Sequence, residues 1–414
     1  MNTSAGTAAA PDDRVRGADR PDVARRADQH LAQPFAQEGS ADTLADRLVG
    51  ATIAALELFS VHLGRELGLY QALAGRSLTY PELAERAAIT PRYAREWLEQ
   101  QAVAGLVEVV GPEPHGGHDR AAVADDDRRD STDRDHPEQR RYGLPAAHQR
   151  VLLAPDDATH VAPLADMVAG VGGVLRDLPR AYRTGSGVAY AAYGRAFRRG
   201  QAGVNRPVFA NDLHSWMDAM PDVAARVASD PLARVADIGC GEGWSTLALA
   251  REFPLASVDG YDSDPASIDA ARRQAAAAGL AGRVVFHLED ASSPDALHQP
   301  YDLVLVFEAL HDMARPREVL AALRAALSGD GAILVADERV AETFTAPGDD
   351  VERLMYGWSV THCLPASLAD IPSAALGTVL RSDTVHALAA QAGFTTSREL
   401  SVDNDFFRFY RLDP

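Results

Sequence analysis

From residue 235 onward, short apolar runs alternate with segments whose apolar residues recur at helical spacing. The runs predict strands at residues 235–238, 257–261, 284–287, 303–307 and 332–336, and the segments between them predict helices at 244–253, 265–278 and 316–327. This alternation is typical of a mostly parallel sheet with right-handed crossovers. Two further strand-like segments, 395–402 and 406–412, follow each other closely. We therefore expect a terminal hairpin that adds one antiparallel strand.

The N-terminal half shows helical spacing instead. An apolar stripe over residues 48–63, followed by a short apolar segment at 67–73, predicts helical structure with which packing begins. Thr79 and Glu82 have capping-box spacing, and Thr90 before Pro91 starts another helix. Weak strand signals follow at residues 106–110 and 142–144. This order predicts a winged helix.

A winged helix can bind DNA by placing its recognition helix, here residues 92–104, in a major groove. Between residues 41 and 110, however, acidic residues outnumber arginines by nine to six, whereas DNA readers usually present a basic face. We therefore favour a dimerisation or substrate-covering role.

Two stretches lack the apolar residues that a core needs. Residues 1–40 show no repeating apolar face, and residues 111–141 contain no Leu, Ile or Phe, so we expect a disordered tail and a disordered insert. His115, His118 and His136 lie in that insert without preorganised geometry, and no metal site is expected there.

These features divide the chain into a tail (1–40), a winged-helix domain (41–150), a helical connector (151–230) and an α/β domain (231–414) with a substrate insert at about 342–380. Gln201, Asn205 and Arg206 in the connector either fold over the ligand site or pack between the domains.

Composition narrows the possible functions. A net charge of −19 opposes attraction to nucleic acids and anionic membranes. The chain contains no lysine, which excludes Schiff-base and phosphate-loop chemistry. Its two cysteines are too few for a disulfide framework or a cysteine metal site. With no signal-peptide pattern and no apolar run of membrane-spanning length, we expect a cytoplasmic protein.

A glycine-rich turn follows the first strand of the α/β domain. Asp237 lies in the last part of this strand, and Gly239, Gly241 and Gly243 lead into the next helix. Alternate glycines let a ligand approach the backbone, where the N–H groups of the following helix also point. The pattern alone fits either a tight turn or a dinucleotide site.

Polar residues also follow the later strands, where ligands of such sheets bind. Asp262 can accept two hydrogen bonds from a ribose diol, and Asp290 can accept one from an adenine amino group. Glu308 follows the fourth strand. Asp262 and Asp290 together predict a nucleoside site.

The successive runs VADIGCGEG, GYD, EDA and LSGDGAILV resemble the motifs of class I S-adenosylmethionine-dependent methyltransferases. The resemblance implies a Rossmann-like domain that uses S-adenosylmethionine and releases S-adenosylhomocysteine. An NAD-binding Rossmann domain is disfavoured by the acid at Asp237 and by the terminal hairpin. The implied cofactor-binding residues are Asp237, Gly239, Gly241, Gly243, Asp262, Asp290, Ala291 and Glu308.

The whole arrangement resembles bacterial two-domain methyltransferases and small-molecule O-methyltransferases, whose similar N-terminal domain mediates dimerisation. It implies a homodimer that methylates a small molecule, with oxygen as the first expectation and carbon or nitrogen as alternatives. The competing hypothesis is a transcriptional regulator that senses the methyl donor through a methyltransferase-like domain.

His311 is the candidate base, because Leu310-His311-Asp312-Met313 resembles the Leu-His-Asp-Trp run of small-molecule O-methyltransferases. A neutral histidine can accept a proton at physiological pH, and Asp337 or Glu338 could orient it. We predict His311 and Glu338 as the catalytic residues, without a metal ion. Met313 departs from the pattern, and a structural or donor-contact role for His311 is the alternative.

The acceptor pocket is expected from the segment at residues 350–365, which offers apolar walls and a few polar groups. The alternative is a core helix. Cys363 in this segment is expected to be a buried residue rather than a nucleophile. The predicted substrate residues are Met355, Tyr356, Trp358 and His362.

Overall fold

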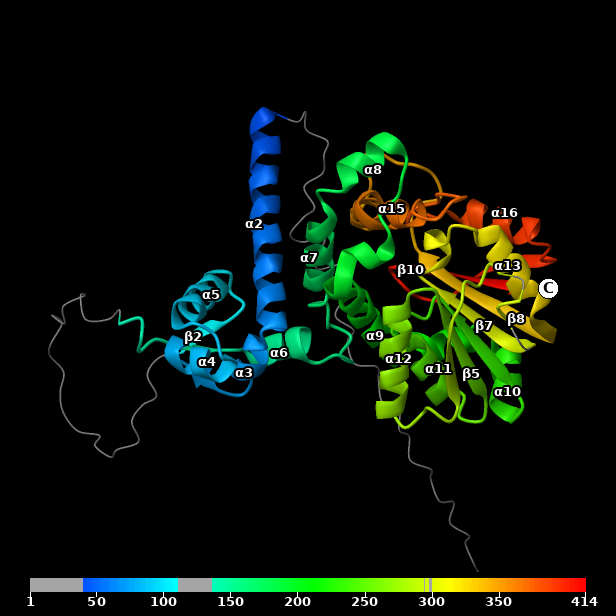
Figure 1. The fold of residues 1–414 in the computed structure, drawn as a ribbon, viewed down its shortest axis with the longest axis horizontal. Helices are drawn as coiled ribbons and strands as arrows, with labels where there is room; N and C mark the ends of the chain where they lie inside the picture. The colour runs from blue at the N-terminus through cyan, green and yellow to red at the C-terminus, as the bar shows by residue number, and fades with distance from the viewer. Residues whose placement is uncertain (1–39, 111–135, 294, 298–299) are drawn as a thin grey trace, which may run out of the picture.

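The computed structural model describes residues 40–110, 136–293, 295–297 and 300–414 (Figure 1). The expected disordered tail, apart from residue 40, and most of the expected insert, with His115 and His118, lie outside these residues. Among the described helices, none combines the length and the apolar character needed to cross a bilayer.

The α/β domain is built on a seven-stranded sheet with the order β6-β5-β4-β7-β8-β10-β9. All pairs from β6 to β8 are parallel, and β10 is antiparallel to both of its neighbours. The predicted parallel sheet with a terminal hairpin is thus confirmed. The strands are β4 (Arg234–Ile238), β5 (Ser257–Asp262), β6 (Val284–Leu288), β7 (Tyr301–Phe307), β8 (Leu327–Glu338), β9 (Thr396–Leu400) and β10 (Phe407–Asp413).

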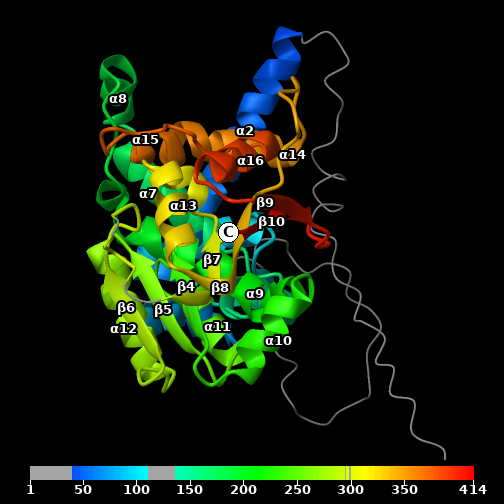
Figure 2. The same cartoon turned by 90° about the vertical axis from the view of Figure 1, so that its right-hand side faces the viewer.

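Alternate residues of the central strands bury against helices on opposite faces of the sheet. Leu303 and Leu305 of β7 belong to one apolar core, whereas Val304 and Val306 belong to the other. The first core includes α10 (Pro221–Ser229), α11 (Trp244–Glu252) and α12 (Pro265–Ala277), and the second includes α13 (Pro316–Ala325) and α16 (Ser382–Gln391). Figures 1 and 2 show these layers. The helices cover the two faces of the sheet, and the carboxyl ends of the parallel strands remain open to form a ligand site.

The N-terminal part contains the predicted elements and one more. Its helices are α2 (Ala41–Glu66), α3 (Leu69–Leu73), α4 (Tyr80–Ala87) and α5 (Pro91–Val103), and its antiparallel strands are β1 (Ser77–Leu78), β2 (Glu108–Val110) and β3 (Arg141–Gly143). The capping box of Thr79 and Glu82 is present. Strand β1 was not expected from the sequence. The assignment of this part as a winged helix stays a prediction.

Helix α2 forms where the apolar stripe predicted it, but it stands largely clear of the chain's own core (Figure 1). Only Val61 and Gly64 of this helix are buried, while Leu48 and Leu56 are each 59% exposed. The expectation that packing begins at this stripe is therefore wrong within one chain. Helical spacing predicts that one face of the helix is apolar, but it does not predict which surface packs against that face.

The connector is helical, as expected, and it reaches into both halves of the molecule. Its elements are α6 (Ala146–Leu153), α7 (Leu164–Val174), α8 (Leu178–Thr184), the short 3-10 helix η1 (Tyr190–Tyr193) and α9 (Gly194–Asp218). The buried carboxylate of Asp166 accepts hydrogen bonds from Arg65 of α2 at 3.1 Å and Arg199 of α9 at 3.3 Å, and contacts His62 at 2.7 Å. This network ties α2 to the helix that lines the site.

The expected insert follows β8 as α14 (Asp350–Trp358), a π-helical turn η3 (Ser359–Cys363) and α15 (Leu364–Ser367). The connector lies directly on it. Tyr182 and Tyr193 donate hydrogen bonds to the carbonyls of Val360 and Thr361, at 2.6 and 2.9 Å. These contacts place the insert above the carboxyl ends of the strands (Figure 2).

Candidate active site

A cavity of about 710 Å³ opens at the carboxyl ends of β4, β5 and β7. Three kinds of segment line it: the strand ends with their following turns, the connector, and the end of the insert. The lining includes Tyr190, Arg198, Gln201, Asn205, Gly239, Gly241, Asp262, Asp264, Asp290, Ala291, Glu308, Asp312, Arg315, Ala366, Ala369 and Asp370.

The three predicted glycines occupy different structural environments. All have positive φ, and Gly239 and Gly241 line the cavity. A Cβ on Gly239 would lie 2.6 Å from the Cβ of Ala309, whereas one on Gly241 would meet nothing within 4 Å. Gly243 does not line the cavity, because its backbone packs against Phe286. Gly241 therefore exposes its backbone to open space, where a ligand can lie against it.

Asp237 lies beneath the loop rather than in the cavity. Its carboxylate is buried and accepts hydrogen bonds from the hydroxyls of Ser245 at 2.6 Å and Thr246 at 2.5 Å. Burial raises its pKa to about 6, although both hydroxyls oppose the shift. Asp237 thus connects the end of β4 to the start of α11 through hydrogen bonds. These bonds fix the conformation of the glycine turn between the two elements.

Asp262 at the end of β5 lines the cavity as predicted. Its two oxygens accept hydrogen bonds from the backbone N–H groups of Gly241 and Asp264, both at 2.8 Å. Burial raises its pKa, and these N–H donors counteract part of that rise. The carboxylate retains lone pairs for a ligand, because each oxygen can accept more than one hydrogen bond.

Asp290 and Ala291 also line the cavity. Asp290 pairs with Arg315 and accepts a hydrogen bond from the N–H of Ser292 at 2.9 Å. Burial would raise the pKa of Asp290, but Ser292 and Arg315 outweigh it and lower the pKa. The carboxylate is therefore held in its charged, accepting form.

Glu308, after β7, has a φ of 46° and accepts a hydrogen bond from Asn205 of α9 at 2.5 Å. Burial raises the pKa of Glu308 to about 7, while His311 and Asn205 act in the opposite direction.

The connector also contributes to the cavity lining. Tyr190 donates a hydrogen bond to Gln201 at 2.9 Å, and both residues line the cavity. Two of the three connector residues singled out from the sequence thus reach the site. Arg206 lies over the ring of Trp244 instead.

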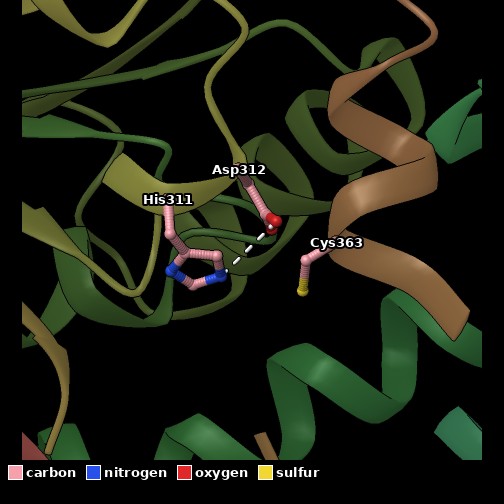
Figure 3. Close-up of side chains that lie close together, drawn as sticks. All are labelled: His311, Asp312 and Cys363. Atoms are coloured by element: carbon pink, nitrogen blue, oxygen red, sulfur yellow. Dashed lines mark ion pairs between the residues drawn. The ribbon is translucent and has the colours of Figure 1, made fainter. Parts of the chain in front are cut away.

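His311 is buried one layer behind the cavity. It belongs to the 3-10 turn η2 (Leu310–Asp312), and its Nδ1 lies 2.8 Å from Asp337 and 3.3 Å from Glu338 at the end of β8. Its Nε2 lies 3.4 Å from Asp312, which lines the cavity (Figure 3). The expected contact between His311 and the acids after β8 is present.

Charge around His311 bears on its role as a base. Burial lowers its pKa, but attraction by Asp337, Glu338 and Asp312 outweighs burial and raises the pKa well above the usual value. Burial also raises the pKa of Glu338 well above its usual value. A protonated imidazole has no free lone pair with which to accept a proton. The group that meets the cavity here is Asp312, which the sequence had not singled out.

The four predicted substrate residues stand outside the cavity lining. Met355 is buried, Tyr356 is exposed, and Trp358 packs against Phe197 of α9. His362 stacks on the same Phe197 ring with 4.0 Å between centroids. The insert lines the cavity instead with residues 366 and 369–372. These are mostly small or apolar, and no sequence signal marked them.

The segment from residue 229 to 388 matches a family model described as "Methyltransferase domain". The chain carries a methyltransferase domain. Its fold is that of class I methyltransferases, because 89 to 92% of the chain superposes on solved structures that include an S-adenosylmethionine-dependent methyltransferase and a methyltransferase in complex with SAM.

Two solved structures and one curated relative illustrate the likeness. Mitomycin 7-O-methyltransferase MmcR covers 90% of this chain and 97% of its own, with a TM-score of 0.54 and 18% identity. Human N-acetylserotonin methyltransferase in complex with SAM covers 92% and 99%, with a TM-score of 0.60 and 16% identity. Trans-aconitate 2-methyltransferase of Streptomyces coelicolor is 38% identical over 98 residues, which span 22% of this chain and 31% of that relative.

The cavity of the methyltransferase domain fits S-adenosylmethionine. Gly241 presents open backbone beside Asp262, and Asp290 offers a charged acceptor further along the same wall. Glu308 adds a carboxyl group beside Gly239. Such a set can hold a cationic amino acid, a ribose diol and an adenine amino group.

Proposed function

We propose that this chain transfers the methyl group of S-adenosylmethionine to an oxygen atom of a small molecule. The observation that carries the proposal is the single cavity that joins the glycine turn, Asp262 and Asp290 to Asp312 in front of His311. The likeness to a mitomycin 7-O-methyltransferase and to N-acetylserotonin methyltransferase supports a small-molecule acceptor.

Methyl transfer from a sulfonium is an in-line displacement, so the chain's main work is alignment and proton removal. When bound, S-adenosylmethionine supplies an electrophilic methyl group. In this proposal the backbone of Gly239 and Gly241 contacts the methionine portion of the donor. Asp262 contacts the ribose, and Glu308 contacts the ammonium group. We assign proton handling to the cluster of His311 and Asp312, which Asp337 and Glu338 hold from behind.

Charge indicates the class of acceptor. The cavity lining contains eight acidic residues against two arginines. Arg198 lies 3.6 Å from Asp264, and Arg315 pairs with Asp290, so both arginines already face carboxylates. An acceptor with several carboxylates would meet repulsion here. We therefore propose a neutral or cationic acceptor with apolar surface, rather than a polycarboxylate such as trans-aconitate.

The test is turnover with a panel of acceptors. The full chain is incubated with S-adenosylmethionine and, separately, with phenols, aromatic alcohols, amines and trans-aconitate, while S-adenosylhomocysteine release and the mass of the product are measured. We expect methylated hydroxyl compounds and no methylated trans-aconitate. Asp262→Ala should abolish donor binding, whereas Asp269→Ala on the exposed side of α12 should not. Donor binding without S-adenosylhomocysteine release from any acceptor would contradict the proposal.

We also propose that the chain forms a homodimer through α2. This helix exposes a series of large apolar side chains, more than scattered surface residues would account for: Leu44, Leu48, Val49, Ile53, Leu56, Phe59 and Leu63. Sedimentation of the full chain should show a dimer that Leu48→Asp with Leu56→Asp converts to a monomer. A monomeric unmodified chain at micromolar concentration would refute this interface.

The competing regulator hypothesis receives no comparable support. On α5, Arg92 pairs with Glu96, and Arg95 pairs with Glu99 at 3.0 Å, so both arginines face carboxylates rather than a free basic surface. A gel-shift assay with donor-free and donor-saturated protein should show no specific DNA binding. The cytoplasmic location remains a prediction from the sequence.

A further inference from the structure

A proline interrupts the bonding of the insert's helix just before this helix reaches the cavity. Pro365 has no N–H group to donate to the preceding turn. In an α-helix that N–H would bond the carbonyl of Thr361, and in a π-helix it would bond that of Val360. The turn η3 is π-helical, and the N–H of Leu364 bonds the carbonyl of Ser359 there. The carbonyls of Val360 and Thr361 thus lose the donor that Pro365 cannot supply.

The connector supplies a donor to each of these two carbonyls. The hydroxyl of Tyr182 donates to Val360 at 2.6 Å, and the hydroxyl of Tyr193 donates to Thr361 at 2.9 Å. Tyr193 is 3% exposed, whereas Tyr182 is 61% exposed. Because a buried hydroxyl that loses its partner cannot turn to water instead, the bond of Tyr193 should matter more.

A close backbone contact lies between the two tyrosines in the sequence. The N–H of Val188 donates to the carbonyl of Pro365 at 2.9 Å. One residue earlier, a Cβ on Gly187 would overlap the backbone of Leu368 and Ala369. Gly187 does not have a positive φ, so the close approach, rather than the backbone conformation, requires a glycine here.

Four connector residues therefore hold the end of the insert, and together they are named the clamp: Tyr182, Gly187, Val188 and Tyr193. Both segments that the clamp joins continue directly into the cavity wall. Ala189 and Ala191 line the cavity from the connector, and Ala366 and Ala369 line it from the insert. A displacement at the clamp would move both sides of this wall.

The rest of the site is held independently of the clamp. Glu352 of α14 is buried and accepts a hydrogen bond from Arg381 at 2.6 Å, which anchors the beginning of the insert. At the cofactor end, Asp262 accepts hydrogen bonds from Gly241 and Asp264 within the α/β domain. Loosening the clamp should therefore shift η3 and α15 while α14 and the cofactor end keep their geometry.

We propose that Gly187 and Tyr193 are positioning residues for the acceptor. Neither residue lines the cavity, so each acts through the insert, by fixing where Ala366 and Ala369 lie. The wall that they position presents methyl groups, which select an acceptor by the outline of its apolar surface. Because the proposed methyl transfer assigns this end of the cavity to the acceptor, the role rests on that function. Its signature is weaker acceptor binding with unchanged donor binding.

Kinetics and calorimetry test this role in the full chain. Gly187→Ala should raise KM at least about tenfold for the panel acceptor with the highest turnover, because the wall is displaced. Tyr193→Phe removes only the hydroxyl and should raise KM about fivefold. The Kd of S-adenosylmethionine should change less than about twofold in both variants. The matched controls, which should retain KM, are Gly173→Ala, where a Cβ meets nothing within 4 Å, and Tyr93→Phe on the exposed side of α5.

Hydrogen exchange gives a reading that needs no acceptor. The amide of Val188 and the amides of residues 359–370 should exchange at least about tenfold faster in Gly187→Ala than in the unmodified chain, and Gly173→Ala should leave them unchanged. If Gly187→Ala folds poorly, Tyr193→Phe provides the same comparison over residues 359–370. If no panel acceptor is methylated, the proposed function fails, whereas the exchange reading still decides whether the clamp holds the insert.

Three results would overturn the positioning role. The first is unchanged hydrogen exchange over residues 359–370 in both Gly187→Ala and Tyr193→Phe. The second is a KM for the acceptor that stays within about twofold of the unmodified chain in both variants. The third is a loss of donor affinity as large as the loss of acceptor affinity, which would indicate general loosening of the domain instead.

Discussion

The two ends of the cavity are built in different ways. The cofactor end comes mainly from one stretch, residues 237–308, in which carboxylates accept hydrogen bonds from nearby groups: Asp262 from the N–H of Gly241, and Asp237 from Ser245 at the start of α11. The acceptor end combines the turn after β7, the end of β8, the insert and the connector. A locally bonded site can be encoded in a short motif, whereas an assembled site depends on the packing of distant segments.

The largest expected effect separates the two ends by function. Asp312→Asn removes the carboxylate that lines the cavity in front of His311, so kcat should fall by about 100-fold or more. Donor affinity should change less than about twofold, because the cofactor end is built separately. Steady-state kinetics and calorimetry measure the two quantities. Asp370→Asn, which alters an exposed acid on the same lining, serves as the control, and an equal loss of donor affinity would break the separation.

A second substitution probes the cofactor end alone. Gly239→Ala forces a side chain into positive φ and against Ala309, so the turn should shift. We expect the free energy of unfolding to fall by about 2 to 4 kcal/mol and donor affinity to fall at least about tenfold. Gly282→Ala is the matched control, because its φ is not positive and a Cβ there meets nothing within 4 Å. Wild-type donor binding by Gly239→Ala would show that the turn is not the cofactor's support.

The pH dependence of donor binding tests how Glu308 contributes. Its pKa in the free chain is raised to about 7 by burial, and the methionine ammonium should favour the ionised carboxylate. Below this pKa, Glu308 must lose its proton when S-adenosylmethionine binds. The affinity for the donor should therefore rise about tenfold from pH 6 to pH 8. Calorimetry across this range should show a flat profile for Glu308→Gln. An unchanged slope in that variant would assign the titration to another group.

The smallest expected effect concerns the link between the connector and the cofactor end. Asn205→Ala removes the side-chain donor to Glu308, and donor affinity should fall by about fivefold. Gln201→Ala removes a neighbouring lining residue that bonds Tyr190 instead, and it provides the comparison. Equal losses in both variants would indicate a general loosening of α9 rather than the specific bond.

Much of the fold followed from local patterns. Every predicted strand of the α/β domain is present, and the hairpin of β9 and β10 lies where two close strand signals placed it. Asp262 and Asp290 line the cavity, because residues at the carboxyl ends of neighbouring parallel strands meet at one edge. The apolar stripe of α2 predicted a helix correctly but not its exposure, since spacing does not identify a partner.

The sequence alone determined the strands, the glycine turn and the carboxylates that follow it, because their interactions are made within a few residues or between adjacent strands. Only the tertiary structure decided that His311 lies behind Asp312, that Cys363 faces both, and that residues 366–372 rather than Met355 or Trp358 line the cavity. The acids at the end of β8 hold His311, and the connector packs on the insert that carries Cys363 and residues 366–372. Packing between segments more than 100 residues apart leaves no periodicity or spacing in the chain from which it could be predicted.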